Sequence, residues 1–180
     1  MSDSTPEITA PETTAPETTA PAGPTPFPSE EERRALLEES GIPEEFHHLL
    51  GPHGVAPLNR RLGIRMVEMS AERMVATMPV AGNEQNVGIL HGGAHFVLAE
   101  SLGSVAALLH VYQNLGEVHP TVGTELSATH HRSVSEGTVT ATCTPLNLGR
   151  QMTSHEIVMR DDAGRRLSTA RMTNMILRPR

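Results

Sequence analysis

The sequence predicts an α+β fold in which one long central helix is wrapped by a curved antiparallel sheet of about five or six strands. Two observations support this prediction. Residues 92–112 contain no proline and are apolar on nearly every side, which is typical of a helix that is buried on most of its faces. Six β-rich runs, separated by turn residues, lie on either side of this stretch. A sheet long enough to curl around the helix supplies the burial that the helix needs.

The size and charge of the chain exclude several classes of protein. Its 180 residues suit one compact domain. The formal net charge is −7, but the first fifty residues hold eleven acids against Arg33 and Arg34, so the remainder is close to neutral. That remainder has no lysine and few aromatic residues, and it therefore lacks the basic stripe and stacking side chains that nucleic-acid binding needs. We expect no nucleic-acid partner.

The same composition points to the cytoplasm. The lone Cys143 cannot form an intramolecular disulfide, and the N-terminus has prolines and threonines where a signal peptide needs an apolar run. No uninterrupted apolar stretch reaches the roughly eighteen residues that a membrane span requires. We therefore expect a cytoplasmic protein that has no membrane partner.

The chain divides into three parts by composition. Residues 1–28 are rich in Pro, Thr, Ala and Glu and contain a direct repeat, so we expect a disordered acidic tail. Residues 29–57 are expected to form two short helices, one with a capping box that begins at Ser29 and one that opens at Pro43. Residues 58–180 form the main domain.

Alternating apolar patterns place the strands. Two runs around a turn at Ser70-Ala71-Glu72 predict a hairpin. Four further runs, each bounded by turn residues, predict an antiparallel meander after the helix. The six expected strands are residues 62–69, 74–80, 121–132, 138–148, 152–160 and 166–177.

Glu100 is the outstanding position for chemistry. It lies in the middle of the apolar helix, where an ionised carboxylate is costly unless it has a purpose or a partner. Ser104 follows four residues later on the same face, and the pair could hold a water molecule. The alternative is a narrow solvent-exposed stripe through Glu100, Ser101 and Ser104.

A polar, glycine-rich loop runs into the start of the helix. Free N–H groups and the helix dipole favour developing negative charge there, and Gln85 and His91 add donors near Gly92. The alternative for the paired glycines is a tight turn. Gly92 and Glu100 are about 12 Å apart at the helical rise, too far for both to touch one carbonyl group. If both act, two chains must meet, with Glu100 of one chain opposite His91 and Gly92 of the other.

Two other groups of side chains are weaker candidates. His91 and His95 have a spacing that could hold a metal, but the sequence has no His-Glu-x-x-His motif and no cysteine pair, so we expect no metal and no cofactor. His130-His131-Arg132 and Asn147-Leu148-Gly149-Arg150-Gln151 lie at strand ends, where they could meet the phosphates of a long ligand. Arginines at strand ends are usually just solvated.

Several motifs, in order along the chain, closely resemble the PaaI-like hot-dog thioesterases. The similarity is strongest to the branch with the enterobactin-pathway proofreading thioesterases, the 1,4-dihydroxy-2-naphthoyl-CoA hydrolases and the Arthrobacter-type 4-hydroxybenzoyl-CoA thioesterases. It covers roughly residues 58–177. The motifs are Gln85, Leu90-His91-Gly92-Gly93-Ala94, Leu98-Ala99-Glu100, Gly103-Ser104, Val122-Gly123-Thr124-Glu125-Leu126, Ala128-Thr129-His130-His131-Arg132, Val134-Ser135-Glu136-Gly137 and Leu148-Gly149-Arg150-Gln151.

The resemblance implies a hot-dog fold, a dimer with two active sites at its interface that is commonly doubled into a homotetramer, and hydrolysis of acyl thioesters on coenzyme A or a carrier protein. It implies that Glu100 is the catalytic carboxylate, as nucleophile or general base, and that the Gly92 N–H polarises the carbonyl oxygen. Gln85 and His91 match positions that orient the carbonyl and assist the thiolate, and Ser104 matches the position that places water.

The resemblance also implies a set of residues that line coenzyme A. These are Gly123, His130, His131, Arg132, Ser133, Asn147, Leu148, Gly149, Arg150, Gln151 and Met152. Ser133 stands where relatives have proline and Met152 where many have Asn or Ser, and both changes could alter the nucleotide rim. The expected substrate is an aromatic or medium acyl-CoA. The alternatives are proofreading of misacylated carrier proteins and a non-catalytic acyl-CoA-binding subunit, and the complete catalytic set argues against the latter.

Overall fold

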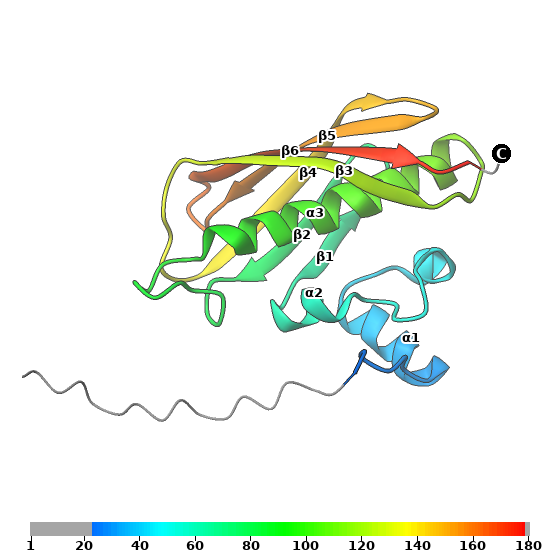
Figure 1. The fold of residues 1–180 in the computed structure, drawn as a ribbon. Coiled ribbons are helices and arrows are strands. Elements are labelled where there is room, and N and C mark those ends of the chain that lie inside the picture. The colour runs from blue at the N-terminus through cyan, green and yellow to red at the C-terminus, as the bar shows by residue number, and fades with distance from the viewer. Residues whose placement is uncertain (1–22, 179–180) are drawn as a thin grey trace, which may run out of the picture.

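The computed structural model describes residues 23–178 and contains one six-stranded sheet that curves along one side of a long helix, α3 (Gly92–Leu109) (Figure 1). Every pair of neighbouring strands is antiparallel. The predicted α+β fold with a central helix is confirmed. The predicted tail lies outside the described residues for its first twenty-two positions.

The strand order is β1-β2-β4-β5-β6-β3. The predicted hairpin is present, and so is the meander from β4 to β6. The strands are β1 (Arg65–Met69), β2 (Met74–Pro79), β3 (Thr121–His130), β4 (Thr138–Leu148), β5 (Met152–Arg160) and β6 (Arg166–Ile176).

The prediction that β3 belongs to the same meander is wrong, because β3 pairs with β6 at the far edge of the sheet. The connection at 131–137 makes this possible. Seven extended residues span about 23 Å, whereas the three strand spacings from β3 to β4 need about 14 Å. Turn residues alone therefore did not distinguish a hairpin from a crossover.

Between residue 23 and the sheet the chain forms three short helices: α1 (Glu30–Glu39), the 3₁₀ helix η1 (Glu44–Leu49) and α2 (Pro57–Arg61). The predicted capping box is confirmed, since Ser29 Oγ accepts from the Glu32 N–H and the Glu32 carboxylate accepts from the Ser29 N–H. The expected strand start at residue 62 is wrong. Leu62 is instead the C-cap of α2, a helix whose signal is the proline at its first turn.

Helix α3 packs one face on the sheet. Its buried side chains include Leu98 and Leu102, which belong to the same core as Ile157 and Met172 of the sheet. A short π-helix, η2 (His110–Asn114), continues the helix. The stretch Gly92–Asn114 is long and apolar enough to cross a membrane, but most of it is buried inside the fold, as in a core helix of a globular domain.

The sheet does not cover the whole circumference of α3. Glu100 is exposed, and Ser101 and Ser104 are half-buried. In a single chain the helix therefore has a partly open stripe, which was the alternative interpretation of its polar residues. The expectation that the sheet buries the helix on most sides is too strong, because six strands reach only one side of it (Figure 1).

Candidate active site

Glu100 and Ser104 face the same way from the middle of α3. The Ser104 hydroxyl donates to Glu100 Oε1 at 3.2 Å, which confirms that the two side chains share one face. Gly123 of β3 lies against the same carboxylate. A Cβ atom at Gly123 would stand 2.8 Å from Glu100 Oε1, so only glycine leaves the carboxylate this room. The strand bulges directly after this point, between Gly123 and Glu125.

The carboxylate opens into a cavity of about 590 Å³. One wall comes from α3, and the opposite wall comes from the N-terminal segment and the start of β1. Its polar lining residues are Glu100, Ser104, Ser40, Asn59 and Ser101, and the rest of the lining is apolar; it includes Ile42, Leu50, Val55, Ile64, Met66, Phe96, Val97, Val105 and Leu126. This arrangement suits an apolar group whose reactive end lies at Glu100.

The N-terminus of α3 offers one free backbone donor. His91 is the N-cap, and its Nδ1 accepts from the Gly93 N–H at 2.8 Å, so a neutral His91 ring has its proton on Nε2. The Ala94 N–H donates to the His91 carbonyl at 2.9 Å. Within residues 23–178 the Gly92 N–H makes no hydrogen bond. It is therefore available to stabilise a developing oxyanion.

Gly92 faces a second cavity, of about 420 Å³. Gln85 lines it, and so do His130, His131, Arg132 and Ser133 from the end of β3 and the loop after it. Neither Glu100 nor Ser104 lines this cavity, and His91 does not line it either. Within one chain, the carboxylate and the oxyanion donor thus belong to different cavities.

The hydrogen bonds of His130 fix the orientation of its ring. Ser168 Oγ donates to the Thr129 carbonyl, so His130 Nδ1, 3.0 Å from that hydroxyl, is the donor of their contact. His130 Nε2 then faces Gly92, 3.1 Å from where a Cβ atom would stand. The neighbouring His95 ring lies 5.1 Å away, and its burial, with a smaller contribution from the charge of His130, lowers the pKa of His95 to about 4.

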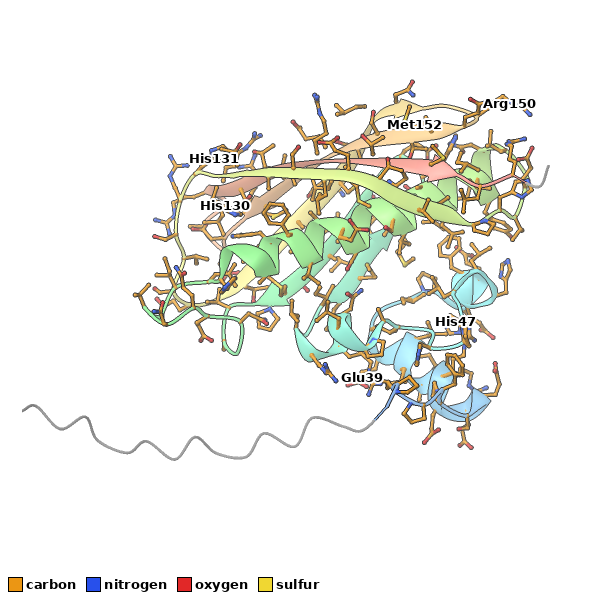
Figure 2. The ribbon with its side chains drawn as sticks, in the orientation of Figure 1. Glu39, His47, His130, His131, Arg150 and Met152 are labelled. Carbon is orange, nitrogen blue, oxygen red and sulfur yellow. The ribbon has the colours of Figure 1, made fainter. Side chains whose placement is uncertain are left out.

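The other expected coenzyme A residues lie far from this cavity. Figure 2 shows Arg150 and Met152 at one end of the sheet, and His130 and His131 at the opposite end. The turn that carries Asn147, Leu148, Gly149, Arg150, Gln151 and Met152 is tied to the C-terminal end of α3. There, His110 Nε2 donates to the Gly149 carbonyl at 3.1 Å. The predicted ligand-lining residues are therefore not brought together within one chain.

The histidines spaced as a metal pair are engaged separately. His91 Nδ1 accepts from the Gly93 N–H, and His95 Nδ1 contacts Met159 Sδ at 3.1 Å. Among the described residues, no group of three or more His, Cys, Asp or Glu side chains is arranged to hold a metal ion.

Sequence reasoning missed the N-terminal wall of the larger cavity. Its residues are separated from Glu100 by the first hairpin and a loop, and nothing in their local pattern marks them as site residues. It also missed Asn59 of α2, whose Oδ1 accepts from Ser101 Oγ at 2.8 Å on the cavity wall. The proline that begins α2 was the available signal for the position of Asn59.

Comparison with known proteins identifies the family. The pattern of the Thioesterase superfamily matches residues 87–168. The proofreading thioesterase EntH of Cronobacter turicensis is 43% identical over 129 residues, which cover 71% of this chain and 91% of the relative. The thioesterase HI1161 of Haemophilus influenzae has a similar solved structure (TM-score 0.61, 34% identity, 67% of this chain and 82% of that chain). A variant of the Pseudomonas aeruginosa thioesterase PA1618 is also similar (TM-score 0.63, 32% identity, 83% and 94%). The chain belongs to the thioesterase superfamily, as a PaaI-like hot-dog thioester hydrolase.

Proposed function

We propose that this protein hydrolyses acyl-CoA thioesters with aromatic or medium acyl groups, in two active sites that are each shared between two subunits. In each site Glu100 of one subunit acts on the thioester carbonyl that the Gly92 N–H of the other subunit polarises. We expect the pair of chains to assemble further into a homotetramer, and the enzyme to work in the cytoplasm without a cofactor.

One observation carries the proposal of a shared site. The exposed Glu100 carboxylate and the free Gly92 N–H lie on the same helix, eight residues apart, and line different cavities. If the α3 helices of two subunits meet antiparallel across a two-fold axis, the Glu100 carboxylate of each subunit lies beside the Gly92 N–H of the other. This gives two equivalent sites. The same arrangement would bring the turn at Arg150 of one subunit toward His130 of the other, because these residues lie at opposite ends of the sheet (Figure 2).

The chemistry needs only a few groups. A Glu100 oxygen attacks the thioester carbonyl carbon, or removes a proton from the water that attacks it, and the oxyanion that forms accepts from Gly92. Collapse of the intermediate breaks the C–S bond and releases the thiolate of coenzyme A, a good leaving group that needs little assistance. When Glu100 is the nucleophile, the acyl group remains on it as a mixed anhydride, which water then hydrolyses to the free acid and the free carboxylate. When Glu100 is the base, the free acid forms directly, and the proton that Glu100 took from water passes to the thiolate. Gln85 and His91 supply donors for the carbonyl and the thiolate, and the Ser104 hydroxyl orients Glu100 or the water.

Thiol release from a panel of CoA thioesters tests the catalytic roles. Glu100→Gln is expected to lower kcat by about a thousandfold, because it removes the base or nucleophile. Gly92→Pro removes the oxyanion donor at the first position of a helix, where proline is tolerated and where the extended His91 backbone suits it. Gly92→Ala is the matched control, since it adds the same Cβ beside His130 but keeps the N–H group. A kcat as low in Gly92→Ala as in Gly92→Pro would reject the oxyanion role.

Mixing the two inactive variants tests whether the site is shared. Subunits of Glu100→Gln and Gly92→Pro, unfolded together and refolded, form mixed dimers in which one of the two sites has both intact residues. Random pairing then restores about a quarter of the wild-type activity. If each chain held a complete site, the mixture would stay as inactive as the separate variants.

A carrier protein is the second candidate for the acyl donor. It is favoured by the similarity to a relative named as a proofreading thioesterase. The same acyl group presented on coenzyme A and on a phosphopantetheinyl carrier protein, assayed side by side, distinguishes the two. A kcat/KM at least about tenfold higher for the carrier-bound ester would reassign the substrate.

A further inference from the structure

The N-terminal segment, residues 29–56, forms a large part of the wall opposite α3 in the cavity beside Glu100. Ile42, Leu50 and Val55 of this segment line the same space as Val97 and Glu100. Ile42 and Val55 are buried in the core, whereas Leu50 is only half-buried. The size of the cavity therefore depends on where this segment lies.

Arg33 holds the part of the segment that carries Leu50. Its side chain is only 14% exposed, and its Nη2 group donates to the carbonyl oxygens of His47 and Leu50 at 2.6 and 2.7 Å. Its Nε group donates to the Gly51 carbonyl at 3.3 Å. One guanidinium group thus ties α1 to the end of η1 and to the two residues that follow it, including the backbone of the cavity-lining Leu50.

The segment is also attached through the core, where the side chains of Leu37, Ile42, Phe46 and Val55 are buried. Leu37 is the only buried side chain of α1. The Met66 N–H of β1 donates to the Ser40 carbonyl at 2.8 Å, and Gly41, with a positive φ, leaves room for the Met66 carbonyl. Helices this short are not stable alone, so the position of this wall depends on these contacts.

We infer that residues 29–56 select the acyl group by its length, with Leu50 as the contact residue and Arg33 as the positioning residue. This inference rests on the proposed function. Acyl groups that extend past Glu100 into the apolar cavity, such as a medium chain or a ring-bearing chain, would touch Leu50. An acetyl group would end at the carboxylate and never reach it.

Selectivity between acetyl-CoA and octanoyl-CoA tests the inference. Leu50→Trp narrows the cavity and is expected to lower kcat/KM for octanoyl-CoA by about tenfold or more, and to change that for acetyl-CoA by less than about twofold. Arg33→Ala is expected to raise KM for octanoyl-CoA by about fivefold without lowering kcat for acetyl-CoA. Arg34→Ala is the matched control, because Arg34 is on the same helix but is exposed and forms an ion pair with Glu38 of that helix.

Calorimetry can test this selection by length without turnover, by measuring the binding of the non-hydrolysable thioethers S-ethyl-CoA and S-octyl-CoA. The inference requires that Leu50→Trp weaken only S-octyl-CoA. Equal changes for both chain lengths, or no change in either variant, would overturn it. If the wild type hydrolyses no thioester, the proposed function fails. A length-dependent effect of Leu50→Trp on thioether binding would still support the inference that residues 29–56 select the bound group by its length.

Discussion

Acid should destabilise this protein through two histidines that the fold buries. His95 is 4% exposed and His155 is 0% exposed. Neither ring nitrogen of His155 has a hydrogen-bond partner within the described part of the chain. Burial lowers the pKa of each histidine from 6.5 to about 4, with smaller contributions from the neighbouring His130 and His110.

The sign and size of the effect follow from these values. Below pH 6.5 the unfolded chain binds protons at both positions, whereas the folded chain does not bind them until the pH approaches 4. Stability is therefore complete above pH 6.5 and falls as the pH falls from 6.5 to 4. Protonation of each histidine lowers the free energy of unfolding by about 2 kcal/mol at pH 5, and by about 3 kcal/mol at a pH well below 4.

Urea unfolding at pH 7.5 and at pH 5, at one fixed protein concentration, measures this loss. The variant His155→Leu removes one of the two buried groups, and its loss between the two pH values should be about 2 kcal/mol smaller than that of the wild type. His48→Leu is the matched control, because it removes an exposed histidine in place of a buried one. The reasoning is refuted if wild type and His155→Leu lose the same free energy over this range.

Two glycine positions yield further predictions. Gly123→Ala places a methyl group 2.8 Å from Glu100 Oε1, so it should displace the carboxylate and lower kcat by about tenfold or more in a thiol-release assay, while the far-UV circular dichroism spectrum stays that of the wild type. Gly103→Ala adds a methyl group that would overlap the buried Met172 side chain, so urea unfolding should show a loss of about 1–3 kcal/mol. Unchanged stability of Gly103→Ala would show that Met172 can move aside.

Local patterns predicted the elements that depend on neighbours in sequence. The capping box at Ser29 and the apolar helix from Gly92 are decided within a few residues, and both are present. The place of β3 beside β6 depends on the crossing of residues 131–137 from the edge of the sheet to β4, which no local pattern records. The predicted strand start at residue 62 was wrong for the same reason. Leu62 fits an apolar alternating pattern, but in the fold it caps the C-terminus of α2.

The candidate site, too, combines features that depend on neighbours in sequence with features that depend on distant segments. The apolar helix drew attention to Glu100, although its carboxylate is exposed in a single chain, and the helix start drew attention to Gly92; their catalytic roles stay predictions. Which side chains share a cavity with each of them depends on segments distant in sequence. Leu50, for example, lines the same cavity as α3 because Arg33, the edge of β1 and the buried side chains of Ile42 and Val55 hold its segment there.

The edges of the sheet differ in a way that bears on the handling of this protein. The Ser40 carbonyl caps part of the β1 edge, whereas β3, ten residues long, has no strand along its outer edge among residues 23–178. A long bare strand edge is a template for uncontrolled pairing and aggregation. Pairing of this edge with the same edge of a second subunit would satisfy its backbone groups and protect newly made chains. Substitutions that prevent this pairing should therefore leave the β3 edge bare and lower the yield of soluble protein, even where the turnover of the remaining protein is unchanged.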